Sequence, residues 1–158
     1  MRFPLLITFI IFINIACWAQ ESSNPDQEAV KQNIEWFFEA LETQDSTLYQ
    51  EILYPEGQVW AVIKDQGTIK YNTRYFKDDI KRFSPDRVIT ETALDYDIKI
   101  HQNIAVAWVP YTLDINGKFS HCRVDVFTLI KVDQWKIINA SFTVEPDGCK
   151  EVRELIED

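Results

Sequence analysis

The alternation of apolar and polar residues changes its period along the chain, from a helical repeat near the start to a strand repeat later. In residues 25–42 apolar side chains recur every three or four positions, which predicts an amphipathic helix. Asn24 and Pro25 are residue types that commonly begin a helix, at the N-cap and at the first helical position. The face expected to cover a sheet carries Val30, Ile34, Phe37, Phe38 and Leu41.

Shorter elements follow. Asp45 is expected to cap a second helix, which ends at the stretch YPEG, residues 54–57. Residues 58–64 and 68–71 are rich in β-formers on either side of a turn, which predicts a hairpin. A third helix is predicted to begin at Asn72 or Thr73 and to close at the stretch SPDR.

The rest of the chain is nearly all strand. Strands are predicted over residues 93–100, 104–113, 118–132 and 135–144, joined by the turns HQN, DING and DQ. Because helices are grouped early and strands late, this order indicates an α+β fold. We expect N-terminal helices packed on a curved, mainly antiparallel sheet, with a pocket between the two layers.

Two registers are open for the last hairpin. If residues 133–134 form a two-residue turn, the face that carries His121, Arg123 and Asp125 points inward. A three-residue turn would shift the pairing by one and turn His121 outward. We favour the first register. Its pairs are Leu129 with Ile138, Phe127 with Ala140, Asp125 with Phe142, and Arg123 with Val144.

The register of the preceding hairpin, residues 93–100 with 104–113, depends on its turn in the same way. A three-residue HQN loop, with Asn103 in the left-handed conformation, would place Tyr96 and Trp108 together on one face, taken as the inner one. Plain core packing is the alternative for both aromatic residues.

The N-terminus has the features of a secretory signal: Arg2, an apolar run over residues 3–13, and a small residue at the exit, Ala19. We expect residues 1–19 to be removed, residues 20–24 to form a polar leader, residues 25–145 to form one domain, and residues 146–158 to form an acidic tail. Lipidation at Cys17 is the rival processing, but Asn14 stands where such signals want an aliphatic residue. The protein is therefore expected in the periplasm or outside the cell.

The net charge of the chain limits which classes of partner it is expected to bind. The chain has 16 basic and 25 acidic residues, a formal net charge of −9, and no basic stripe. Nucleic acid and anionic membrane surfaces are therefore not expected as partners.

The adjacent pair His121–Cys122 looks like a catalytic dyad, but strand alternation points the two side chains to opposite faces. Zinc is not supported either, because the only other histidine, His101, lies in a predicted turn and no second cysteine stands at ligand spacing. We expect no metal and no cofactor. After loss of Cys17, Cys122 and Cys149 are the remaining thiols, and in an oxidising compartment they would form one disulfide if the fold brings them together.

Three segments carry a family resemblance: IEWFFEALETQDSTLYQEIL, AVAWVPYTLDINGKFSHC and VDVFTLIKVDQWKIINASF. With them the chain resembles the nuclear transport factor 2-like (SnoaL-like) superfamily, and more narrowly its exported bacterial members labelled "putative lumazine-binding". The resemblance implies a cone-shaped fold. It also supports the disulfide, because related sequences pair the SHC strand with a cysteine near the C-terminus.

Three function hypotheses follow from this reading. The first is a binding domain with an apolar pocket. The second is an isomerase, cyclase or dehydratase in which Asp125 serves as base with His121 as its partner, and Tyr49, Tyr54 or Tyr111 as donor. Asp125 and His121 would be about 13 Å apart on an ideal strand. The third is a non-enzymatic module that forms a homodimer through the outer sheet face. The expected pocket residues are Trp60, Tyr96, Trp108, His121, Arg123, Asp125, Phe127 and Phe142.

Overall fold

Helices come first and strands dominate the rest of the chain in the computed structural model, which describes residues 24–65, 67–84, 86–144, 149 and 152. The predicted signal peptide and most of the predicted acidic tail lie outside these residues. The elements are α1 (Pro25–Thr43), α2 (Ser46–Ile52), β1 (Leu53–Asp65), β2 (Thr68–Tyr75), α3 (Phe76–Asp79), the 3₁₀ helix η1 (Ile80–Arg82), β3 (Ile89–Ala93), β4 (Asp97–His101), β5 (Ile104–Ile115), β6 (Lys118–Lys131) and β7 (Trp135–Val144).

The two N-terminal helices begin at the caps that the sequence predicts. The Asn24 side chain accepts a hydrogen bond from the backbone N–H of Asp26 at 3.1 Å. Asp45 accepts from the N–H groups of Thr47 and Leu48, at 2.9 and 3.0 Å. Each cap satisfies backbone donors that have no partner inside the helix, so the chain starts both helices at defined positions.

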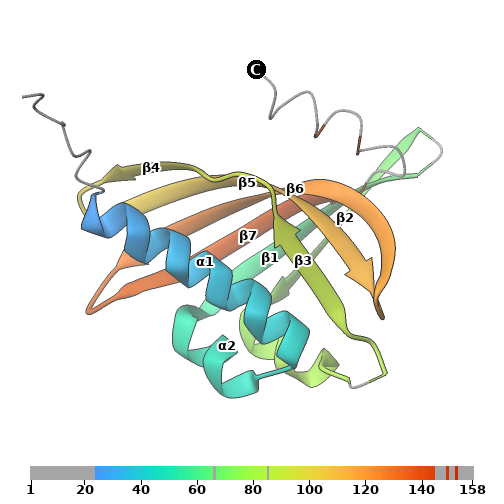
Figure 1. The fold of residues 1–158 in the computed structure, drawn as a ribbon, viewed down its shortest axis with the longest axis horizontal. Helices are drawn as coiled ribbons and strands as arrows, with labels where there is room; N and C mark the ends of the chain where they lie inside the picture. The colour runs from blue at the N-terminus through green and yellow to red at the C-terminus, as the bar shows by residue number, and fades with distance from the viewer. Residues whose placement is uncertain (1–23, 66, 85, 145–148, 150–151, 153–158) are drawn as a thin grey trace, which may run out of the picture.

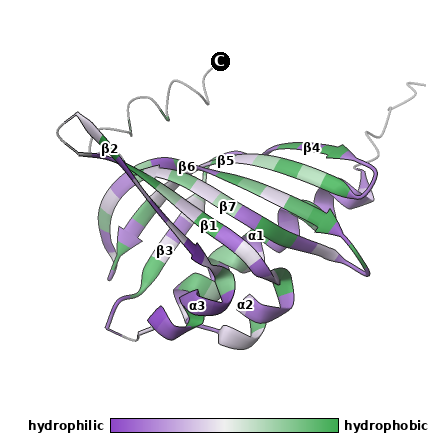
Figure 2. Ribbon diagram, turned by 180° about the vertical axis from the view of Figure 1, so that it is seen from behind, coloured by the Kyte–Doolittle hydropathy of each residue, from purple (hydrophilic) through white to green (hydrophobic). Residues whose placement is uncertain are grey.

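The strands form one curved sheet in the order β2-β1-β7-β6-β5-β3, with β4 also paired to β5. Among the described strands, the β1–β7 pair is parallel and the other pairs are antiparallel. The sheet arches over α1 and α2 (Figure 1). Hydrophobic and hydrophilic residues alternate along its strands (Figure 2), as they do in strands with one buried and one exposed face. The predicted α+β class with helices on a curved, mainly antiparallel sheet is confirmed.

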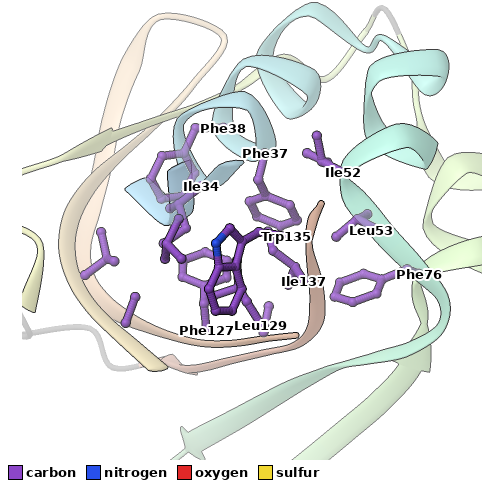
Figure 3. Close-up of a cluster of buried hydrophobic side chains, with 14 of the residues drawn as sticks. Ile34, Phe37, Phe38, Ile52, Leu53, Phe76, Phe127, Leu129, Trp135 and Ile137 are labelled. Atoms are coloured by element: carbon purple, nitrogen blue, oxygen red, sulfur yellow. The ribbon is translucent and has the colours of Figure 1, made fainter. Parts of the chain in front are cut away.

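The core lies between α1 and the inner face of the sheet (Figure 3). Ile34, Phe37 and Phe38 of the helix point toward the sheet, and the Phe37 and Phe127 rings meet edge to face at 5.3 Å. Phe127 is fully buried. This end of the sheet is therefore closed by packing, and any open space must lie elsewhere.

The last hairpin combines the two registers that the sequence left open. Near the turn Lys131 pairs with Trp135 and Leu129 with Ile137, as in a three-residue turn. Beyond a bulge at Ile138 the pairing becomes that of the two-residue turn, so Asp125 faces Phe142. The predicted Leu129–Ile138 pair is thus wrong. Because of this one extra residue in β7, Asp125 points inward as predicted, although the turn is longer than expected.

Gly57 allows β1 to pass this bulge. A Cβ atom at position 57 would lie 2.7 Å from the Ile138 carbonyl oxygen, so only glycine fits there without displacing the backbone.

The preceding hairpin was predicted wrongly. Its turn has two residues, with Gln102 in the left-handed conformation (φ 51°) and His101 paired with Ile104. The pairing is therefore shifted by one from the predicted one, and a shift of one residue turns each side chain to the other face. Trp108 consequently lies on the outer face, where 44% of it is exposed.

Two further boundaries differ from the prediction. The segment predicted as one strand over residues 93–100 is not continuous: it starts at the last residue of β3, which begins at Ile89, and then covers most of the separate strand β4. The third helix starts at Phe76, because β2 continues through Tyr75 as the partner of β1.

The predicted disulfide forms between Cys122 of β6 and Cys149, with their Cα atoms 4.7 Å apart. Among the described residues, no helix is long and apolar enough to cross a membrane.

Candidate ligand-binding site

A cavity of about 380 Å³ opens between the inner face of the sheet and the C-terminal end of α1. Its walls come from α1, α2, the β1–β2 hairpin, the α3–η1 segment, β3, β5, β6 and β7. The apolar wall is made by Phe37, Leu41, Val59, Ala61, Ile63, Phe83, Ile89, Leu113, Ala140, Phe142 and Val144. The polar lining residues are Gln44, Tyr49, Asn72, Arg74, Asp79, Arg82, Arg87, Glu91, Arg123 and Asp125.

Sheet register explains why charged side chains meet on one patch of the floor. Arg123 and Asp125 are two residues apart on β6, so both point inward at about 7 Å spacing. Glu91 reaches the same patch from β3 through the Glu91–Leu113 and Leu113–His121 pairs across β5. The strands thus place two carboxyl groups and one guanidinium on neighbouring inward positions.

Burial raises the pKa of both carboxyl groups, so they hold their protons to higher pH than exposed carboxyl groups do. Desolvation raises the pKa of Glu91 to about 7, although the positive charge of Arg123 lowers it. Desolvation also raises the pKa of Asp125 well above its usual value, and the Glu91 charge adds to that shift while Arg123 opposes it. Since the Glu91 charge raises the pKa of Asp125, Asp125 keeps its proton while Glu91 is ionised.

The Arg123 side chain is held in place, but not all of its hydrogen-bond donors have a partner among the described residues. Its guanidinium lies 5.5 Å from the centre of the Phe142 ring, a cation–π contact that fixes its direction. Its Nε and the Glu91 Oε2 are buried atoms without a hydrogen-bond partner in the described part of the chain. Buried polar atoms nearly always have a partner, so this patch has unused capacity to bind a polar group.

A second polar cluster lies on the opposite wall, around Asp79 of α3. Tyr49 of α2 donates its hydroxyl to Asp79 Oδ2 at 3.1 Å, and Arg74 of β2 donates Nε to Asp79 Oδ1. The Arg82 guanidinium is 3.9 Å from the same oxygen. Burial and the Asp79 charge raise the pKa of Tyr49 above its usual value, so this hydroxyl stays a donor.

The eight predicted pocket residues separate into four groups. Arg123, Asp125 and Phe142 line the cavity. Phe127 is in the closed core behind it. The prediction is wrong for Trp60 and Trp108. The residues next to each of them in the strand point inward, so the two tryptophan side chains lie on the outer face. Trp60 packs there against Tyr71, with ring centres 6.1 Å apart.

Tyr96 and His121 belong to the inner side of the sheet but do not line the cavity. Tyr96 packs at the closed end, with Lys31 5.1 Å from its ring centre. His121 Nδ1 lies 2.7 Å from Ser120 Oγ. Burial and the Arg123 charge lower the pKa of His121 to about 4, so it is neutral at pH 7.

The predicted pairing of Asp125 as base with His121 has no support in this geometry. Arg123 stands between them on the same strand face, and no hydrogen bond joins the two among the described residues. Of the predicted donors, Tyr54 is exposed. Tyr111 lies on the inner face of β5, paired with Arg123, but it is fully buried against Phe38 and does not line the cavity. Only Tyr49 lines the cavity.

Sequence reasoning missed five lining charges: Arg74, Asp79, Arg82, Arg87 and Glu91. Glu91 had a usable signal, because it stands between Ile89 and Ala93 at inward positions of a β-branched stretch. The other four lie in β2 and in short helical and loop segments, where strand or helix periodicity gives no face. Within the described residues, no group of three His, Cys, Asp or Glu side chains is arranged to hold a metal ion.

Helices pack on one face of a curved sheet, and a partly polar cavity opens between the two layers. This arrangement is that of the nuclear transport factor 2-like class of α+β domains. The profile of the family described as "Putative lumazine-binding" matches residues 25–143, and the chain belongs to this family.

Solved structures agree on the fold. A nuclear transport factor 2-like protein from Cytophaga hutchinsonii superposes with a TM-score of 0.59 at 18% identity, over 77% of this chain and 100% of that one. A protein titled putative dehydratase from Streptomyces avermitilis gives 0.57 at 16% identity, over 77% and 99%. One titled putative ketosteroid isomerase from Shewanella frigidimarina gives 0.50 at 19% identity, over 72% and 94%. At these identities the likeness shows a shared fold. A comparison with curated protein sequences found no match.

Proposed function

We propose that the protein is an exported binding domain that takes a small apolar molecule into the cavity beneath α1. The cavity itself is the observation that carries this proposal. Its volume of about 380 Å³ falls in the range of small-molecule sites, about 300–1,000 Å³. Its lining also combines an apolar wall with convergent polar side chains, as small-molecule sites commonly do.

Export is supported by two independent features. The first residues have the pattern of a secretory signal. The Cys122–Cys149 disulfide belongs to an oxidising compartment. In this proposal the signal covers residues 1–19, the binding domain residues 25–145, and the acidic tail is tied back to the sheet by Cys149.

Adjacent residues of β1 provide a matched test. Ile63 lines the cavity, whereas its neighbour Val62 points outward and is 37% exposed. Binding of planar probes, namely lumazine, 1-naphthoate and the neutral 1-naphthamide, would be measured by calorimetry and thermal shift. At least one probe should bind the wild type and Val62→Trp, and Ile63→Trp should abolish that binding. Equal binding to both variants, or none of the probes binding the wild type, would contradict the proposal.

A second candidate is an enzyme that moves a proton, supported by the Glu91–Asp125 pair. Two buried carboxyl groups whose pKa values are driven apart supply a base and an acid in one site. Glu91, which ionises first, is the candidate base; Asp125, which keeps its proton, is the candidate acid and donor to a developing oxyanion. This reverses the role that the sequence assigned to Asp125. The isomerase and dehydratase activities for which two structural neighbours are named are compatible with such chemistry.

Deuterium incorporation at the acidic C–H positions of 2-tetralone, followed by NMR in deuterated buffer, would test this second candidate. Glu91→Gln should abolish the exchange, whereas Glu39→Gln, an exposed change on α1, should leave it unchanged. Exchange by the wild type no faster than in buffer alone, or equal exchange by Glu91→Gln, would count against enzymatic proton transfer.

The outer sheet face supports a further proposal, a homodimer. Ile104, Val106 and Trp108 of β5 are exposed there by 43–47%. They adjoin Val126 of β6, which pairs with Trp108. An exposed apolar patch on a sheet often marks a protein contact, and a second copy of the same face would cover it.

A further inference from the structure

We infer that the molecule bound in the cavity is an apolar body carrying one oxyanion group, a carboxylate or a phosphate, and that Arg82 and Arg87 bind that group. This inference rests on the proposed binding function and adds the chemical class of the ligand. It comes from the distribution of arginine.

Arginine is concentrated in the cavity to an unusual degree. The chain has six arginines, and the four that the structure describes, Arg74, Arg82, Arg87 and Arg123, all line the cavity. None of the described lysines does. Lysine and arginine serve equally as surface charge, but a planar guanidinium matches the two oxygens of a carboxylate or phosphate. A division of this kind indicates recognition of an oxyanion.

The charge balance of the lining points the same way. The protein as a whole carries a formal charge of −9, yet the cavity holds four guanidinium groups against three carboxyl groups. The proton retained by Asp125 makes the cavity more positive still. A positive cavity inside an acidic protein attracts anions that the outer surface repels.

Internal ion pairs do not use all four arginines. Asp79 is already bound by Arg74 and by the Tyr49 hydroxyl, and Arg82 is at the longer distance of 3.9 Å with 57% of its side chain exposed. The Arg87 guanidinium has no carboxylate partner in the described part of the chain. Arg82 comes shortly before the turn that the Arg87 backbone N–H closes by donating to the Ser84 carbonyl at 3.0 Å, so both arginines reach the cavity from one segment.

The apolar part of the ligand has its own wall. Phe37 and Leu41 of α1, Phe83 beside Arg82, and Phe142 beneath Arg123 face the same space. The predicted ligand is therefore amphipathic, with the ring or chain against these residues and the anionic end toward the segment of Arg82 and Arg87.

Three probes of nearly equal shape separate the alternatives: 1-naphthoate, 1-naphthyl phosphate and neutral 1-naphthamide. Calorimetry on the wild type should show at least one anion binding about tenfold or more tightly than the amide, since a charge-assisted hydrogen bond contributes about 1.5–3 kcal/mol. The naphthoate and phosphate arms identify which oxyanion the site prefers. The double variant Arg82→Gln, Arg87→Gln should remove this preference, so that the anions bind no more tightly than the amide.

Lys81→Gln is the matched control, because it removes one positive charge from η1 outside the cavity, where Lys81 pairs with Asp78 at 2.7 Å. It should bind every probe as the wild type does. Equal binding of amide and anions, or equal loss of anion binding in Lys81→Gln and the double variant, would overturn the inference while the binding function stands. Binding of no probe at all would contradict both. Thermal unfolding of each variant verifies that the fold is intact.

Discussion

Replacing Glu91 with Gln should make the protein more stable at pH 8 and leave its stability nearly unchanged at pH 4. Glu91 is partly buried, with its Oε2 shielded from solvent and without a hydrogen-bond partner among the described residues. Its pKa rises from 4.5 to about 7 on folding, chiefly by desolvation. That difference corresponds to about 3 kcal/mol.

The sign follows from proton binding. A carboxyl group with a raised pKa in the fold stabilises the native state fully below pH 4.5, and this contribution is lost as pH rises to about 7. Glutamine resembles the protonated acid and has no charge to bury, so the variant keeps this stability at every pH. The free-energy difference between variant and wild type should therefore grow from near zero at pH 4 to about 3 kcal/mol at pH 8.

Urea unfolding followed by tryptophan fluorescence, from pH 4 to pH 8.5, measures this difference directly. Glu39→Gln on the exposed face of α1 serves as the control and should run parallel to the wild type. Parallel profiles for Glu91→Gln and the wild type would refute the reasoning, because they would mean that Glu91 ionises in the fold as freely as in the unfolded chain.

Three further changes test separate parts of the structure. Cys149→Ser opens a link between residues 27 apart and should cost about 3.5 kcal/mol of unfolding free energy, an effect that a reductant should reproduce in the wild type but not in the variant. Phe127→Ala empties a fully buried position and should cost about 3–5 kcal/mol, measured by urea unfolding; a loss below about 1 kcal/mol would mean that the core is not closed there. Val126→Asp on the outer face should shift a concentration-dependent dimer to monomer in analytical ultracentrifugation without lowering probe affinity, whereas a wild type that stays monomeric at high concentration would exclude the dimer.

Helix caps and strand alternation predicted the fold class because they act locally. Asn24 and Asp45 satisfy backbone donors within three residues, so their effect can be read directly from neighbouring letters. Alternation likewise predicted that Arg123 and Asp125 share a face, whatever partner the strand has. The pairing of Asp125 with Phe142 was also correct, but only because the bulge at Ile138 compensates for a longer turn.

What the sequence by itself determined is therefore the class of fold, the capped helices and the inward row of β6. Tertiary structure alone decided which residues surround the cavity. A turn one residue shorter than expected moved Trp108 to the outer face, and β3 brought Glu91 next to Arg123 across an intervening strand. Arginines from β2, η1 and the loop after it meet Arg123 of β6 only because the sheet curves. The physical reason is that strand faces depend on register, and register depends on turns and bulges in which one residue reverses every side chain.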